Sequence, residues 1–151
     1  YHLFVVGGGS VVPLLKQMVK EMRMEESVTF VSRQTPENLF NYTSLADIGM
    51  AIDTDISANL RFSLPNKIFE YIKAGTPMVV SNLVERVRIV RQYDVGSVAE
   101  SVTPEAIAQA VKQLSTPERM AVCRENCKTA AQELTWENEE HVLETVYQPL
   151  I

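Results

Sequence analysis

Apolar residues in this chain fall into two patterns, short unbroken runs and longer stretches with helical spacing. Unbroken runs are typical of buried parallel strands, and they predict strands at Leu3–Val6, Val28–Val31, Asp47–Ile52 and Pro77–Val80, with a short strand or turn at Gly96–Ala99. Helical spacing predicts helices at Ser10–Arg23, Pro36–Ser44, Pro65–Ala74, Leu83–Gln92, Thr103–Leu114, Thr116–Leu134 and Trp136–Val146. Because strands alternate with helices, we expect an α/β fold with a doubly wound parallel sheet.

Two finer expectations follow from the same pattern. Leu39, Phe40 and Leu45 share the apolar side of their helix and are predicted to face inward. The polar stretch Asp53–Phe62 predicts a loop, and Pro149 is expected to end the last helix.

Three predicted helices begin with the same tripeptide, Thr-Pro-Glu, at residues 35–37, 103–105 and 116–118. The threonine side chain caps a free backbone amide, and the glutamate faces the positive end of the helix dipole. Proline, which has no N–H, fits the first turn because an amide there would have no acceptor within the helix. The start at Ser63-Leu64-Pro65-Asn66-Lys67 differs, because a cation replaces the acid. An unpaired Lys there costs roughly 0.3–1 kcal/mol, but a helix N-terminus with a Lys is also a good phosphate site.

Glu70 lies one turn beyond Lys67, and its carboxylate could accept hydrogen bonds from two sugar hydroxyls. The alternative is an ion pair between Lys67 and Glu70 at i,i+3, which would contribute little to stability. The residues alone favour neither interpretation.

Ligands of doubly wound folds bind at the carboxyl ends of the strands. Four segments are predicted to lie there: Gly7–Gly9, Ser32-Arg33, the loop from Asp53 to Leu64, and Ser81-Asn82. The three glycines do not make the G-x-G-x-x-G dinucleotide fingerprint, because Val12 stands in the third glycine position. They favour a tight turn between strand and helix first, and close approach of a ligand second.

Other candidate chemistry is weaker. Asp53-Thr54-Asp55 could hold a divalent metal against a diphosphate, but a solvated loop is favoured, and no metal is expected. The serines and histidines show no hydrolase arrangement. Cys123 and Cys127 are interpreted as free thiols.

Composition narrows the partners. The chain has 151 residues, 46% of them hydrophobic, a formal net charge of -5 and a pI of about 5.1, so it is not built to attract nucleic acid. The basic cluster of Arg86, Arg88 and Arg91 is interpreted as a solvated helix face.

No apolar run could span a membrane, and the protein is expected in the cytoplasm. Since Tyr1 is not an initiator Met, we interpret the chain as a fragment of a longer protein.

One segment resembles a known family. Residues Phe62–Ser81, FSLPNKIFEYIKAGTPMVVS, closely resemble the donor-binding segment of group 1 (family 4-like) retaining glycosyltransferases of the GT-B fold. The resemblance extends to Leu3–Gly9, Val28–Asp47 and Leu134–Trp136, and so to nearly the whole chain. It implies a Rossmann-like C-terminal domain of a two-domain protein, formed by residues 1–151 as a single domain, without the first strand-helix unit that the family's domain has.

The resemblance also implies residue roles. Glu70 matches the second of two family glutamates and is expected to bind ribose hydroxyls, and Lys67 is expected to neutralise the leaving diphosphate. Lys67 and Glu70 are the predicted catalytic residues. The first family glutamate falls at Phe62, so the pair is broken here. The predicted nucleotide-sugar-binding residues are Gly8, Gly9, Val31, Ser32, Arg33, Ser63, Leu64, Pro65, Asn66, Lys67 and Glu70.

The implied function is transfer of a sugar from a UDP- or GDP-sugar, with retention of configuration, to a polysaccharide or glycolipid acceptor. The acceptor would bind an N-terminal domain absent from this chain, so the fragment alone is expected to be inactive. The full-length protein would lie in the cytoplasm, either free or peripherally at the inner face of the membrane. Three alternatives stay open: a non-catalytic nucleotide-sugar-binding domain, which Phe62 favours; a GT-B-like nucleotide-sugar epimerase; and a flavodoxin-like binding module.

Overall fold

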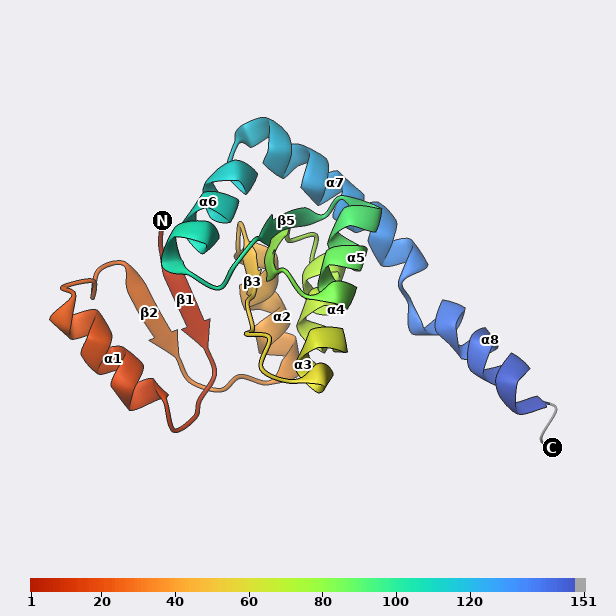
Figure 1. Ribbon diagram of the computed structural model, residues 1–151, viewed down its shortest axis with the longest axis horizontal. Coiled ribbons are helices and arrows are strands. Elements are labelled where there is room, and N and C mark those ends of the chain that lie inside the picture. The colour runs from red at the N-terminus through yellow and green to blue at the C-terminus, as the bar shows by residue number, and fades with distance from the viewer. Residues whose placement is uncertain (149–151) are drawn as a thin grey trace. The chain divides into compact units, whose positions relative to one another are not determined.

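The computed structural model describes residues 1–148 and has two compact units, Tyr1–Tyr42 and the chain from Thr43 onward. Its parallel strands alternate with helices, which confirms the predicted α/β class (Figure 1). Among the described residues the strands pair as two sheets, one of two strands and one of three. That the chain is one domain of a longer two-domain protein stays a prediction. The predicted helix end at Pro149 lies outside the described residues.

The first unit is a pair of parallel strands with one helix between them in sequence. Strand β1 (Leu3–Val6) pairs with β2 (Val28–Val31), and Val6 lies opposite Val31. The connecting helix α1 (Val12–Glu21) starts later than predicted, because Val11 is its N-cap and Ser10 caps nothing. Helix α1 has no fully buried residue: Val12, Leu15 and Val19 are half-buried, whereas Leu14 and Met18 are exposed. The unit therefore has little core of its own.

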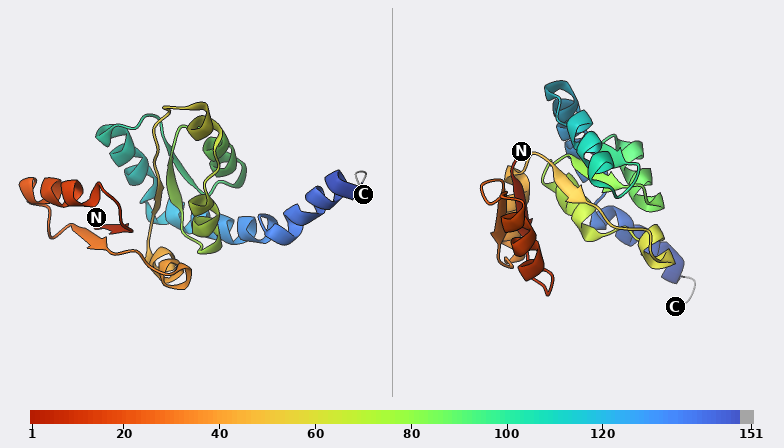
Figure 2. Two further views of the ribbon diagram at one scale, coloured as in Figure 1. Left: turned by 90° about the horizontal axis from the view of Figure 1, so that it is seen from below. Right: turned by 60° about the vertical axis from the view of Figure 1, so that its left-hand side comes forward.

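The second unit is a three-layer α/β structure. Its sheet has the order β3 (Gly49–Ala51), β4 (Met78–Ser81), β5 (Gly96–Ala99), all parallel. Its helices are α3 (Ala58–Phe62), α4 (Asn66–Lys73), α5 (Val84–Tyr93), α6 (Pro104–Leu114), α7 (Pro117–Glu133) and α8 (Trp136–Tyr147). Figure 2 shows α8 continuing from α7 away from the sheet in both views, and α8 buries no residue.

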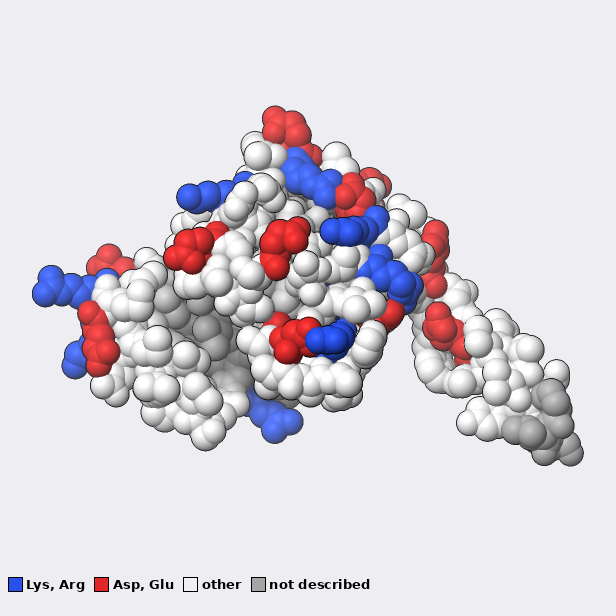
Figure 3. Space-filling model, in the orientation of Figure 1, with Lys and Arg blue, Asp and Glu red and all other residues white. Residues whose placement is uncertain are grey.

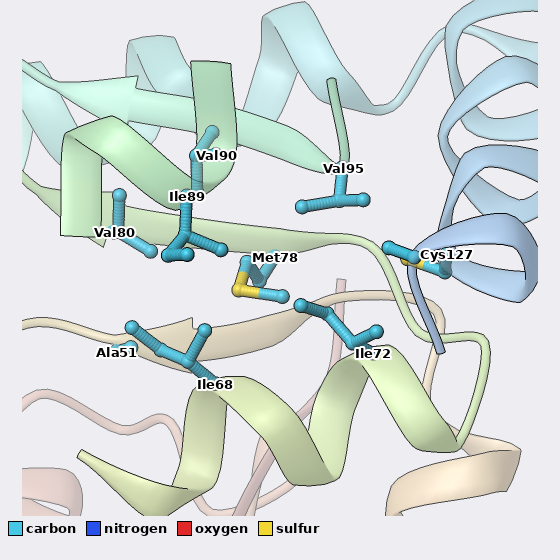
Figure 4. Close-up of a cluster of buried hydrophobic side chains, with 10 residues drawn as sticks. Ala51, Ile68, Ile72, Met78, Val80, Ile89, Val90, Val95 and Cys127 are labelled. Carbon is cyan, nitrogen blue, oxygen red and sulfur yellow. The ribbon is translucent and has the colours of Figure 1, made fainter. Parts of the chain in front are cut away.

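Strand β4 supplies both faces of the sheet. Met78 and Val80 belong to one buried cluster with side chains from α4 and α5, and Figure 4 shows them packed together. Val79 points to the other face and belongs to a second cluster with Ala110 and Leu114 of α6. Side chains on a strand alternate between faces, so one continuous apolar run fills both clusters.

The Thr-Pro-Glu prediction is confirmed at all three places. Thr35, Thr103 and Thr116 each accept a hydrogen bond from the amide three residues on, at 3.3 Å. Thr135 caps α8 in the same way. The pKa of Glu37 is lowered by hydrogen bonds from its own backbone amide and from Thr35, which is what a carboxylate at a helix start should show.

Two expectations about helices are wrong. Residues 58–62, predicted within a loop, form α3, whose start is capped by Ser57 accepting from the Leu60 amide. In α2 (Pro36–Leu45) the buried residue is Thr43, whereas Phe40 and Leu45 are exposed. The backbone explains the burial of Thr43, because its carbonyl accepts a hydrogen bond of 2.8 Å from the buried Thr76 hydroxyl. This bond comes from a segment distant in sequence, which local periodicity could not reveal, and Leu39 is half-buried.

Helix α7 contributes side chains to the buried clusters on both faces of the sheet. Cys127 and Ala130 join the cluster with Met78, and Cys123 joins the cluster with Val79. Both thiols are free, as predicted. Burial raises the pKa of Cys127 to about 12, so that thiol stays protonated and unreactive.

An ion pair joins α7 to the turn after α5. Arg119 donates to both carboxylate oxygens of Asp94, at 2.7 and 2.5 Å, and to the Gly96 carbonyl at 3.0 Å. Asp94 itself has a left-handed backbone, with φ of 53°, and ends α5. The guanidinium of Arg119 therefore fixes an otherwise strained turn.

We expect this pair to make stability acid-sensitive. Arg119 holds the pKa of Asp94 below its usual 3.8. The unfolded chain therefore takes up the proton first, and the contribution is present above about pH 4 and lost as the pH falls through the lowered pKa. Asp94→Asn, which tolerates the same backbone, should cost about 0.5–1 kcal/mol at neutral pH, because both groups are partly exposed. Urea unfolding of both proteins should show this difference shrinking toward pH 2.

The surface is mixed in charge. On the face in Figure 3, acidic and basic side chains are interspersed over the second unit and do not gather by sign. Among the described residues, none of the helices has the length and apolar character needed to cross a membrane.

Candidate functional site

The start of α4 is held by apolar packing on one face. Leu64 lies against the buried cluster, and Ile68 and Ile72 belong to it. The solvent face carries Asn66 and Glu70, which are exposed. Pro65 is the N-cap and has no side chain that can cap, so the helix begins at Asn66, one residue later than the sequence pattern predicted. The helix start is thus firmly placed while its polar groups face outward.

That helix start has donors without acceptors. The Ile68 amide bonds to the Pro65 carbonyl at 3.1 Å, whereas the amides of Asn66 and Lys67 have no partner within residues 1–148. The first turn contains no acid. Two amides and a cation therefore meet at one place, where the helix dipole is positive.

The ion-pair alternative for Lys67 is not formed. Among the ion pairs of residues 1–148, none joins Lys67 to Glu70. Lys67 is half-buried and Glu70 exposed. Next to Glu70, Tyr71 donates its hydroxyl to the Met50 carbonyl at 3.1 Å, and burial raises the pKa of Tyr71. Tyr71 thus anchors α4 to β3. Because Lys67 and Glu70 do not pair with each other, both are available to a ligand.

The two aspartates after β3 are each paired with an arginine. Asp53 accepts from Arg86 at 2.5 Å, and Asp55 accepts from Arg61 at 2.9–3.0 Å. Asp53 is thus held by a buried cation, whereas Asp55 is exposed in a surface ion pair, as the solvated-loop interpretation predicted for it. The described part of the chain contains no group of three metal-ligating side chains.

Arg86 is the functional candidate that the sequence interpretation missed. It was predicted to lie on a solvated face, but its side chain is 1% exposed. Its guanidinium also reaches the Ala51 carbonyl at 3.2 Å and the Ser81 hydroxyl at 3.3 Å. The signal was present, since Leu83, Arg86 and Val90 are spaced three and four apart on one helix side. Arginine occupies a core position of α5.

The remaining predicted residues lie in the first unit, at the carboxyl ends of β1 and β2. The Gly7 amide donates to the Val31 carbonyl at 2.9 Å, so the glycine turn and Val31 are adjacent. Ser32 and Arg33 follow Val31 and are exposed. The backbone carbonyl of Ser32 accepts a hydrogen bond from the side-chain amide of Gln34. The structure thus brings Gly8, Gly9 and Val31–Arg33 to one rim, and separately brings Ser63–Glu70 to one rim of the second unit.

Gly7, Gly8 and Gly9 differ in whether the fold requires glycine at their positions. Gly7 has φ of +144°, a conformation that L side chains rarely adopt, which confirms the tight turn there. A Cβ on Gly8 or Gly9 would meet nothing within 4 Å. The fold therefore does not require glycine at these two positions, and open space remains beside the backbone.

Sequence comparison identifies one family. Residues 1–116 match the model of the family described as glycosyl transferases group 1. No curated protein matches the chain in sequence.

Solved structures share the fold. Sucrose-phosphate synthase from Thermosynechococcus elongatus has a TM-score of 0.80 at 22% identity, over 99% of this chain and 38% of its own. WaaG, a glycosyltransferase involved in lipopolysaccharide biosynthesis, has a TM-score of 0.73 at 20% identity, over 95% and 37%. The pneumococcal O-GlcNAc transferase GtfA, in complex with UDP and GlcNAc, has a TM-score of 0.74 at 16% identity, over 99% and 29%. The chain thus spans well under half of each of these proteins.

Proposed function

The chain belongs to the glycosyl transferases group 1 family and has the Rossmann-like fold of a GT-B C-terminal domain, and from this premise we propose that it binds the nucleotide-diphosphate sugar donor of a glycosyltransferase. The observation that carries the proposal is the start of α4, where Lys67 and two unpartnered amides lie together. A diphosphate supplies the negative charge and the acceptor oxygens that these donors lack.

Charge stabilisation is the proposed mechanism. As the bond between the sugar and the phosphate breaks, negative charge grows on the diphosphate. Lys67 and the α4 amides stabilise that charge, and because they are already in place they lower the barrier without reorganising. No metal ion is needed for this step. Retention of configuration is proposed from the family resemblance.

The other predicted residues have a place in this scheme. Glu70, one turn beyond Lys67 and exposed, accepts hydrogen bonds from the ribose hydroxyls. Gly8 and Gly9 allow the ligand to approach the backbone, which accounts for glycine where the fold does not require it. Val31, Ser32 and Arg33 line the base. A sugar or lipid-linked acceptor binds another part of the full-length protein.

A UDP-sugar is the donor to try first. GtfA has this fold and was solved with UDP and GlcNAc, so the fold accommodates a uridine nucleotide. GDP-sugars remain the other candidate.

One observation favours a second function, a non-catalytic nucleotide-sugar-binding domain. Phe62 stands where the family resemblance places the first glutamate, and its side chain is 58% exposed. A phenyl ring cannot accept hydrogen bonds from a sugar as a carboxylate does. The two functions differ in turnover, because only the enzyme transfers or hydrolyses the donor.

Calorimetric titration of the full-length protein tests the proposal. We expect one nucleoside diphosphate among UDP, GDP and ADP to bind more tightly than pyrophosphate. Absence of binding by all of them would contradict the donor site. Release of the nucleoside diphosphate from its sugar conjugate, measured next, distinguishes the enzyme from the binding domain.

Glu70→Gln should separate nucleoside binding from diphosphate binding. Replacing the carboxylate by an amide weakens hydrogen bonds to the ribose, so affinity for the preferred nucleoside diphosphate should fall about fivefold to tenfold. Affinity for pyrophosphate, which has no ribose, should not change. Glu125→Gln, an exposed acid on α7, serves as the control for the loss of one charge. Equal weakening toward both ligands would contradict the ribose role.

A further inference from the structure

A buried cation contacts the turn that leads into the proposed donor site. Arg86 on α5 is among the largest fully buried side chains, at 1% exposed. Within residues 1–148, the one carboxylate paired with it is Asp53, at 2.5 Å. Its Nε has no hydrogen-bond partner among the described residues. Burying a guanidinium in this way costs free energy that an apolar side chain of similar size would not.

The guanidinium joins three separate pieces of chain. It donates to the end of β3, through the Ala51 carbonyl and Asp53, and to the end of β4, through the Ser81 hydroxyl. It also reaches the Ser63 hydroxyl, in the turn before α4, at a long 3.5 Å. The Ser81 hydroxyl in turn accepts from the Asp53 amide at 3.1 Å. One nitrogen of the guanidinium, Nη1, thus binds the polar ends of two strands, and the other, Nη2, reaches the loop before α4.

The contact at Ser63 leads to the donor site. Ser63 donates to the Leu60 carbonyl at 3.1 Å, so its hydroxyl is held from two sides. Ser63 and Pro65 both have extended backbones, and proline restricts the turn further. Lys67 follows within the first turn of α4. A shift of Ser63 is therefore transmitted to Lys67 and to the amides beside it.

We propose that Arg86 is a positioning residue for the donor diphosphate, acting through Ser63 and the turn that precedes α4. The inference rests on the proposed function and names a residue outside the proposed ligand contacts. This role explains why an arginine occupies a buried position of α5 that a methionine of similar size could fill. Methionine donates to none of these four acceptors, and a lysine, with one nitrogen, cannot replace the Nη1 contacts and reach Ser63 as well.

Arg86→Lys is the decisive variant, because it keeps the charge and loses the fork. We expect affinity for the preferred nucleoside diphosphate and for pyrophosphate to fall together by about tenfold in the full-length protein. Equal weakening is expected because the diphosphate end of the site is displaced. Arg88→Lys, on the same helix and 53% exposed, is the matched control and should bind like the wild type.

A second variant separates positioning from stability. Arg86→Met leaves the Asp53 carboxylate without its ion-pair partner, so this variant is expected to unfold more readily. The double variant Arg86→Met with Asp53→Asn removes both charges of the pair. In the double variant the melting temperature should recover and the weak diphosphate binding should persist.

Two results would overturn the inference alone. One is wild-type affinity in Arg86→Lys, and the other is binding that recovers with stability in the double variant. If the wild-type protein binds neither pyrophosphate nor any nucleoside diphosphate, the proposed function fails and this inference fails with it.

Discussion

Lys67→Ala is expected to weaken binding of nucleoside diphosphate and of pyrophosphate by about tenfold to a hundredfold. A charge-assisted hydrogen bond to a diphosphate is worth roughly 1.5–3 kcal/mol, and no ion pair within residues 1–148 occupies Lys67. The melting temperature should stay the same or rise slightly, because a cation at a helix N-terminus opposes the dipole. Calorimetry and thermal unfolding measure the two effects on the same samples.

Transfer by the full-length protein should suffer more than binding. If Lys67 meets charge that develops as the glycosidic bond breaks, its removal costs about a hundredfold to a thousandfold in kcat. Lys73→Ala is the matched control, since Lys73 is an exposed cation in the last turn of the same helix. A Lys67→Ala protein that loses stability but binds diphosphate as before would contradict the assignment.

Gly96→Ala is expected to destabilise the second unit by about 3 kcal/mol or more. Gly96 lies opposite Met78 in the sheet, and a Cβ there would come within 2.9 Å of the Met78 carbonyl carbon. Backbone atoms of a central strand cannot move aside as a flexible side chain can, so the strands must separate locally. Thermal unfolding should show a fall in melting temperature of roughly ten degrees.

Gly8→Ala is the matched control for that substitution. It is the same change in the same protein, but the new Cβ would meet nothing within 4 Å. Its melting temperature should match that of the wild type, whereas its affinity for nucleoside diphosphate should fall if the ligand approaches the backbone there. A stable Gly96→Ala protein would mean that β4 and β5 can part without cost.

Local chemistry made most of the fold predictable. The threonine caps at residues 35, 103 and 116 were correct because a cap is decided by residues three apart in sequence. The short α3 was missed because its five residues show no apolar periodicity, although Ser57 was a usable start signal. Leu45, wrongly predicted to face inward, is exposed, and the bond to the Thr43 carbonyl near it comes from Thr76, which is distant in sequence.

The candidate site divides in the same way. Lys67 stood out because a cation in the first turn breaks a local rule, and the structure leaves it unpaired within the described residues. Arg86 was missed because charged residues next to one another suggest a solvated face. Its partners, Ala51, Asp53 and Ser63, come from distant segments. Burial of a charge depends on such partners, which pattern and spacing do not disclose.

Helix α7 has a consequence for how the second unit comes apart. Its 17 residues contribute to the apolar clusters on both faces of the sheet, so neither face can open while the other stays closed. Backbone amides of β4 should therefore exchange with deuterium only through global unfolding, with one common free energy of opening whichever cluster the residue's side chain joins. Amides of α8, which buries no side chain, should exchange long before.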